Sequence, residues 1–136
     1  MPVSGSDTVP AMEMHPFRTA VEARDLDAMV EQLAEDVEFH SPVSFRPFVG
    51  RDAAARVLGA VLDTFEDFRY VDELEGDGTH ALIFRARIGD RQVHGLDHLE
   101  LDGDGRIAVF TVMVRPLSAL AALAEAMGPK VADVAH

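Results

Sequence analysis

The sequence contains no cysteine, which excludes a disulfide framework, a thiolate zinc site and a cysteine nucleophile. Basic residues are scarce, since 12 Lys and Arg stand against 24 Asp and Glu, for a formal net charge of −12. Such a chain repels a phosphate backbone and an anionic bilayer, so we expect neither nucleic acid nor a membrane as a partner. No apolar run approaches the roughly 18 residues of a membrane span. Glycine-rich phosphate loops and serine nucleophile elbows are also missing, and we expect no cofactor and no metal site.

The composition is that of an ordinary globular protein, with 48% hydrophobic and 26% charged residues. A length of 136 residues fits a single domain. The first seven residues lack the basic start and apolar stretch of a signal peptide, so we expect a small soluble protein of the cytoplasm. We expect a flexible arm over residues 1–9, one domain over residues 10–128 and a frayed tail over residues 129–136.

Hydrophobic periodicity predicts both helices and strands. Apolar residues recur at helical spacing over residues 10–24, 26–33, 52–65 and 117–124. Asp25 is the expected N-cap of the second helix, and Gly128 is expected to end the last one. Alternation predicts strands over residues 37–40, 68–74, 80–88, 92–101 and 107–114. This order predicts an α+β fold, in which a curved antiparallel or mixed sheet wraps around helices as a cone-shaped barrel with a cavity inside.

Particular segments carry a family resemblance. They are Ala23-Arg24-Asp25-Leu26-Asp27-Ala28, Val37-Glu38-Phe39-His40-Ser41-Pro42-Val43, Gly50-Arg51-Asp52-Ala53 and Gly103-Asp104-Gly105-Arg106-Ile107. Over roughly residues 16–127 the chain resembles the SnoaL-like branch of the nuclear transport factor 2-like superfamily. The resemblance implies a cystatin-like cone, often dimeric, with a hydrophobic pocket. It does not select an activity, since the superfamily includes isomerases, polyketide cyclases, dehydratases, epoxide hydrolases and non-catalytic binders.

Ketosteroid isomerase is the distant relative with a well-understood site. The resemblance places its general base at Ser41 and its oxyanion-hole tyrosine at Phe17, and neither side chain can replace the original. Its second oxyanion donor, a protonated aspartate, corresponds to Asp97. The resemblance therefore implies a chemistry other than that of a true ketosteroid isomerase.

Asp97 is the candidate catalytic residue. On its predicted strand it shares a face with Val93, Gly95, Leu99 and Leu101, because strand side chains alternate. A carboxyl group on an apolar face tends to stay protonated, and it can then act as an acid or hydrogen-bond donor near neutral pH. Alternatively, Asp97 is a structural residue bonded to a neighbouring strand.

The histidines are weaker candidates. Alternation turns His40 outward and Ser41 toward the cavity, although a bulge at the strand end would turn His40 inward. His94 and His98 lie about 13 Å apart on a strand, too far to share a metal ion. His80 follows a turn and is expected to be solvated.

The phenylalanines fall in elements expected to line or close the cone. Phe45 and Phe48 lie in a loop, where they are expected to form a lid over an apolar ligand. The expected ligand contacts are Phe17, His40, Ser41, Phe45, Phe48, Phe65, Phe84, Phe110, Val112 and Val114.

The last predicted strand is apolar on both faces. One face carries Ile107, Val109 and Met113, and the other carries Phe110, Val112 and Val114. A sheet open to water on one side would show polar residues there. We therefore expect a two-fold homodimer that packs through the outer face of the sheet.

Together these features predict a protein that binds an apolar small molecule, polyketide-like or terpenoid-like, in a conical pocket. As an enzyme it would be a cofactor-free isomerase, cyclase or hydratase with Asp97 as the acid or base. Two alternatives stay open. One is a non-catalytic ligand-binding or dimerisation module, and the other is a scaffold for a protein partner.

Overall fold

The computed structural model describes residues 14–134, so the expected arm over residues 1–9 lies outside the described part. The elements in chain order are α1 (Pro16–Glu22), α2 (Leu26–Glu31), β1 (Leu33–His40), β2 (Phe48–Val49), α3 (Arg51–Thr64), β3 (Glu66–Glu75), β4 (Thr79–Ile88), β5 (Arg91–Leu101), β6 (Ile107–Arg115) and α4 (Leu117–Val131).

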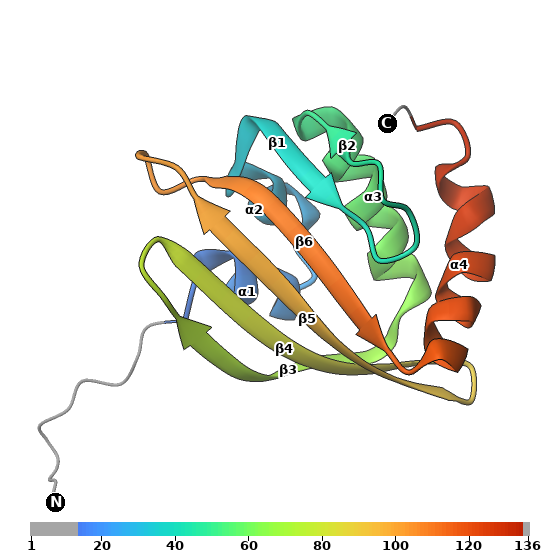
Figure 1. The fold of residues 1–136 in the computed structure, drawn as a ribbon. Helices are drawn as coiled ribbons and strands as arrows, with labels where there is room; N and C mark the ends of the chain where they lie inside the picture. Colours follow the sequence, from blue (N-terminus) through green and yellow to red (C-terminus); the bar gives the residue numbers. More distant parts are fainter. Residues whose placement is uncertain (1–13, 135–136) are drawn as a thin grey trace, which may run out of the picture.

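The strands form one six-stranded sheet in the order β2-β1-β6-β5-β4-β3. β1 and β6 run parallel, and every other neighbouring pair is antiparallel, so the sheet is mixed. The helices lie behind the curved sheet in Figure 1, with α4 along one side. The inner face of the sheet carries the core, and within residues 14–134 no helix covers the other face. This is the α+β architecture that the sequence predicts.

Short helices at the start of the described chain are held by side-chain caps. The Nδ1 atom of His15 accepts from the backbone N–H of Phe17 at 3.0 Å, at the start of α1. At the start of α2, Asp25 Oδ1 accepts from the backbone N–H of Ala28 at 3.1 Å, as expected from the sequence. These caps fix the turn between α1 and α2, whose apolar residues Phe17 and Met29 are buried.

The second helix is shorter than predicted. α2 ends at Glu31, and Leu33 already belongs to β1, where it pairs with Ile107 of β6. The backbone N–H of Ile107 donates to the carbonyl of Gln32 at 2.8 Å. The Gln32 carbonyl therefore accepts from β6, whereas in a longer helix it would accept from a residue of the next turn.

The last helix also differs from the prediction. α4 continues through Gly128 and Pro129 to Val131, and Val134 is buried against the core, so residues 129–134 contribute to the packed structure. Its buried stripe is Ala119, Leu123 and Met127, rather than the stripe that begins at Leu117. Leu117 is exposed. Apolar residues occupy all but two of the positions from Leu117 to Met127, so the pattern alone did not select a face.

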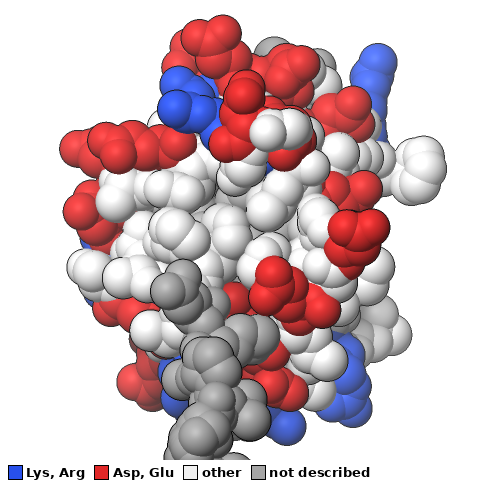
Figure 2. Space-filling view, turned by 90° about the vertical axis from the view of Figure 1, so that its left-hand side faces the viewer, with Lys and Arg blue, Asp and Glu red and all other residues white. Residues whose placement is uncertain are grey.

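Acidic side chains dominate the side of the molecule in Figure 2, where they surround an area of uncharged residues. None of the helices within residues 14–134 is both long and apolar enough to cross a membrane.

Candidate functional site

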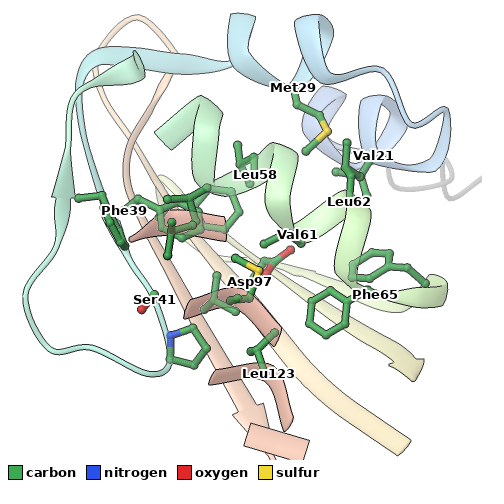
Figure 3. Close-up of a pocket in the computed structure, with 18 of the residues that line it drawn as sticks. Val21, Met29, Phe39, Ser41, Leu58, Val61, Leu62, Phe65, Asp97 and Leu123 are labelled. Atoms are coloured by element: carbon green, nitrogen blue, oxygen red, sulfur yellow. The ribbon is translucent and has the colours of Figure 1, made fainter. Parts of the chain in front are cut away.

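A cavity of about 430 Å³ lies between the inner face of the sheet and the helices. This volume falls in the range of small-molecule sites. Most of its wall is apolar, with contributions from α1, α3, β6 and α4 (Figure 3). The expected hollow inside the cone is therefore present in the protein.

Asp97 reaches this cavity from β5. Strand alternation places it on the inner face with Val93, Gly95 and Leu99, all of which are buried. Figure 3 shows its carboxyl group among apolar side chains that include Val61, on α3. Only 6% of Asp97 is exposed. Its position is the one that the sequence predicts.

One hydrogen bond holds the carboxyl group. The hydroxyl group of Tyr70 on β3 donates to Asp97 Oδ2 at 2.7 Å. Within residues 14–134 the other oxygen, Oδ1, has no hydrogen-bond partner, which leaves it able to meet a ligand. Within the described residues the carboxyl group is thus held through Oδ2 alone.

Burial raises the pKa of Asp97 to about 7, and the hydrogen bond from Tyr70 opposes part of that rise. The pKa of Tyr70 also lies well above its ordinary value, because the phenol is buried and faces the Asp97 carboxyl group. Asp97 can therefore both give and take a proton near neutral pH, while Tyr70 keeps its proton.

Aromatic packing positions Tyr70. Its ring stands at 90° to that of Phe68, with centroids 5.0 Å apart, and Phe68 stacks on Phe84 at 4.8 Å. The Arg18 guanidinium lies 5.9 Å from the centroid of the Tyr70 ring. Tyr70 is a residue of the candidate site that the sequence did not single out. The pairing of the β3–β4–β5 hairpins is the feature that would have found it. This register places Tyr70 opposite Phe84 and Phe84 opposite Gly95, which is two residues from Asp97.

Ser41 also lines the cavity, just after the end of β1. Its Oγ atom accepts from the backbone N–H groups of Val43 at 3.4 Å and Ser44 at 3.2 Å. A hydroxyl group has one donor and two acceptor positions, so the proton of Ser41 remains able to donate to a ligand.

Most of the expected aromatic contacts lie in the wall. The predicted residues that line the cavity are Phe17, Phe48, Phe65, Phe84, Phe110 and Val112. Val114 packs against the core but does not line the cavity, which corrects its expected position. Phe48 is buried in β2 and is part of the wall rather than a mobile cover.

Two other predicted contacts lie outside the cavity. His40 points away from it, and its Nε2 atom lies 3.4 Å from Glu38 Oε1 on the outer face. The register shift in β1 lies before Glu38, so alternation holds from Val37 to His40 and keeps His40 on the outer face. Phe45 is fully exposed in the loop before β2 and covers nothing. Its expected role as a lid residue is therefore not supported by its position.

A second buried polar cluster lies between α1, β3 and β4. The Glu73 carboxylate accepts from Arg18 Nη1 at 3.3 Å and from the backbone N–H of His15 at 3.1 Å. His80 Nδ1 lies 3.4 Å from the same carboxylate, and the His15 and His80 rings are 4.8 Å apart. His80 is therefore largely buried, not solvated as expected. A bulge in β3 after Tyr70 turns Glu73 inward and creates this partner.

No set of three or more His, Asp or Glu side chains in the described part of the chain is arranged to hold a metal ion. The residues that meet in the cavity can instead donate hydrogen bonds and move a proton. Asp97, Tyr70 and Ser41 supply these groups, and most of the wall around them is apolar.

Comparisons with solved structures agree with this architecture. A protein from Silicibacter pomeroyi with a cystatin-like fold matches with a TM-score of 0.82 and 33% identity, over 87% of this chain and 84% of that one. A steroid delta-isomerase from Pseudomonas aeruginosa matches with a TM-score of 0.80 and 41% identity, over 84% of this chain and 85% of that one. An NTF2-like protein from Cytophaga hutchinsonii shares the fold at 19% identity, with a TM-score of 0.59, over 77% of this chain and 88% of that one.

The fold and its internal cavity define an α+β protein of the cystatin-like, NTF2-like class. The model of the SnoaL-like domain matches residues 15–110, and the chain belongs to that family. Among proteins with a curated description, none matches this sequence significantly.

Proposed function

We propose that the cavity binds an apolar small molecule that carries a hydrogen-bond acceptor such as a carbonyl group, and that Asp97 donates to that acceptor. The observation that carries this proposal is the buried carboxyl group, whose pKa is about 7 and whose Oδ1 has no partner among residues 14–134. A neutral carboxyl group in an apolar wall is a strong donor to a carbonyl oxygen, because apolar surroundings strengthen the hydrogen bond.

The same group supports catalysis without a cofactor. When a proton leaves the carbon next to a carbonyl group, negative charge develops on the oxygen, and the Asp97 proton stabilises it as an enolate or enol. Tyr70 holds the carboxyl group in place through Oδ2, and Ser41 can donate a second hydrogen bond. The reaction classes that fit are isomerisation, cyclisation and hydration.

The similarity to a steroid delta-isomerase suggests a steroid as a test ligand, but it does not by itself assign that enzyme's activity to this chain. Ser41 and Phe17 both line the cavity, at the positions where the family resemblance implies a base and a tyrosine. Neither can remove a proton, so we propose a chemistry other than that of ketosteroid isomerase. A 3-ketosteroid remains a suitable test ligand, because it is apolar and carries one carbonyl group.

Non-catalytic ligand binding is the alternative, and one observation favours it. Asp97 and Tyr70 are the only buried titratable side chains that line the cavity within the described residues. Glu22 lines it as well, but this carboxylate is partly exposed and pairs with Arg18 at 3.3 Å. A second buried base opposite Asp97 is therefore lacking, and the substrate or water would have to supply that function.

Binding at different pH values tests the donor role. The affinity of the wild-type protein for a neutral 3-ketosteroid is measured by calorimetry from pH 5 to pH 9. Because only protonated Asp97 donates, the affinity is expected to fall above about pH 7, at most tenfold for each pH unit. In Asp97→Asn the amide still donates, so its affinity is expected to be independent of pH. The matched steroid hydrocarbon without the carbonyl oxygen is the control. Wild-type binding of the ketone that does not change with pH would reject the role of Asp97.

A turnover assay distinguishes catalysis from non-catalytic ligand binding. If the protein is an enzyme, Asp97→Asn is expected to bind the substrate and to lose turnover, because an amide cannot transfer the proton. Full activity in that folded variant would exclude Asp97 as the acid or base. The absence of nucleic acid or membrane partners stays a prediction from the net charge of −12, and a cytoplasmic location stays a prediction with which the lack of cysteine is compatible.

A further inference from the structure

A chain of polar contacts links the second buried polar cluster to Tyr70. Arg18 extends from α1 between two carboxylates, since its Nη1 donates to Glu73 Oε1 and its Nε donates to Glu22 Oε2, each at 3.3 Å. The guanidinium group also lies over the Tyr70 ring, 5.9 Å from its centroid. Tyr70 in turn donates to Asp97 at 2.7 Å. Arg18 is therefore the residue through which the cluster meets the candidate site.

The bulge in β3 makes this arrangement possible. Tyr70 and Glu73 are three residues apart, so simple alternation would turn them to opposite faces of the sheet. The register shifts between Tyr70 and Asp72, and both Tyr70 and Glu73 are buried on the inner side. One strand thus supplies the phenol of the site and the carboxylate that holds a cation beside it.

Glu73 is the better shielded of the two partners of Arg18. Only 1% of the Glu73 side chain is exposed, against 38% of the Glu22 side chain, and Arg18 itself is 19% exposed. Water and salt screen a buried ion pair less than an exposed one. Glu73 also accepts from the backbone N–H of His15 at 3.1 Å, and His80 Nδ1 lies 3.4 Å from it. The fixed carboxylate therefore fixes the guanidinium group at the ring.

The positive charge of Arg18 acts on the phenol of Tyr70. Arginine stays charged at every pH at which proteins are studied, and a cation at an aromatic face is attracted by the ring. Burial and the Asp97 carboxyl group raise the pKa of Tyr70, and Arg18 opposes this rise. A more polarised hydroxyl group is a stronger donor, and a stronger donor favours the ionised form of the carboxyl group that accepts from it.

We propose that Arg18 is a positioning residue of the candidate site, held by Glu73 against the Tyr70 ring, and that its charge strengthens the hydrogen bond from Tyr70 to Asp97. The second polar cluster then serves the cavity, in addition to attaching α1 to the sheet. This inference rests on the proposed function, in which Asp97 donates to a ligand near neutral pH. Acting through Tyr70, Arg18 prevents the buried carboxyl group from holding its proton too tightly to release it.

Removal of the charge tests this role. Arg18→Met keeps an unbranched stem, so the packing of α1 against the sheet is largely retained. The pKa of Asp97 is expected to rise by about 0.5 above its wild-type value of about 7, which corresponds to the loss of one weak cation–π contact. A carbon-detected NMR titration of the ligand-free protein measures it. Arg18→Lys restores a positive charge and is expected to recover most of the change.

A double-mutant cycle tests whether Arg18 acts through Tyr70. In Tyr70→Phe no hydroxyl group remains to transmit the charge. Adding Arg18→Met to that variant is therefore expected to leave the pKa of Asp97 where Tyr70→Phe alone places it. The matched control is Arg56→Met, which removes an exposed arginine charge on α3 and is expected to leave the pKa of Asp97 unchanged.

Glu73→Gln provides a second variant if Arg18→Met disturbs the fold by circular dichroism. The amide oxygen still accepts from the backbone N–H of His15, but the charge that holds Arg18 is lost. The pKa of Asp97 is expected to rise in this variant too, by less than in Arg18→Met, because Glu22 still binds the guanidinium group.

Two results would overturn the proposal. One is an unchanged or lower pKa of Asp97 in Arg18→Met, or in Glu73→Gln where that variant replaces it. The other is a rise that is equally large without the Tyr70 hydroxyl group, because Arg18 would then act on Asp97 directly or through the fold alone. The titration needs no ligand, so it is independent of the binding experiment. Ketosteroid binding that ignores pH would reject the donor role of Asp97 while the effect of Arg18 on the titration still held.

Discussion

The hydroxyl group of Tyr70 and the carboxyl group of Asp97 act as one unit, since neither has another hydrogen-bond partner within residues 14–134. A donor that favours the ionised carboxylate lowers its pKa, and burial raises it. Burial is the stronger of the two effects here, which explains why an aspartate can be neutral near pH 7.

Removal of the Tyr70 hydroxyl group should change the pKa of Asp97 in a direction that follows from these two effects. In Tyr70→Phe the pKa of Asp97 is expected to rise above its wild-type value of about 7, because only burial still acts on it. A carbon-detected NMR titration of the carboxyl groups measures the change. Ser41→Ala removes a hydroxyl group from the same cavity without touching Asp97, and it should leave that pKa unchanged. A lower pKa in Tyr70→Phe would contradict the assigned cause.

At the scale of the element, β5 depends on a glycine opposite an aromatic ring. A Cβ atom on Gly95 would overlap the ring carbons of Phe84. The Phe84 ring cannot yield easily, because it is buried and packs against Phe65 and Phe68. These rings form the wall beside Asp97, so Gly95 fixes the shape of the cavity.

Gly95→Ala is therefore expected to lower the free energy of unfolding by about 1–3 kcal/mol, the usual cost of overpacking. Urea denaturation measures this loss. Gly103→Ala is the matched control in the β5–β6 turn, where an added Cβ atom meets nothing within 4 Å. Its stability is expected to stay within about 0.5 kcal/mol of the wild type. Equal stability of the two variants would show that the ring can move aside.

Element by element, the accuracy of the sequence predictions followed the strength of the local pattern. β5 alternates regularly from Val93 to Leu99, so the inward position of Asp97 was predictable. β3 contains bulges, so simple alternation could not place Glu73 beside His80, nor reveal that His80 is buried. The β1–β2 loop has no period at all, and the exposed position of Phe45 depends on tertiary packing alone.

At the scale of the whole molecule, the buried carboxyl group makes stability depend on pH. Its pKa is about 7 in the folded protein and 3.8 at its ordinary value. A raised pKa means that the folded state holds the proton more tightly. The stabilisation is therefore complete below about pH 4, is lost as the pH rises toward 7, and changes no further above that.

The loss amounts to about 4 kcal/mol at most, since each pKa unit is worth about 1.4 kcal/mol. In Asp97→Asn this contribution cannot titrate. The unfolding free energy of the variant relative to the wild type is thus expected to increase between pH 4 and pH 7 and to level off above it. Urea denaturation at several pH values measures the difference, and Asp90→Asn, at an exposed carboxyl group, serves as the control. A constant difference for Asp97→Asn would show that Asp97 ionises normally.

The hydrogen bond between Tyr70 and Asp97 has a practical consequence, because the chain contains a single tyrosine and no tryptophan. Apart from the weak emission of phenylalanine, all intrinsic fluorescence of the protein therefore comes from Tyr70 in the cavity wall. An ionised carboxylate next to an excited phenol quenches it, whereas a neutral one quenches much less. The fluorescence of Tyr70 in the unlabelled protein therefore reports the charge of the Asp97 carboxyl group. It also reports any bound molecule that moves this carboxyl group away from the phenol.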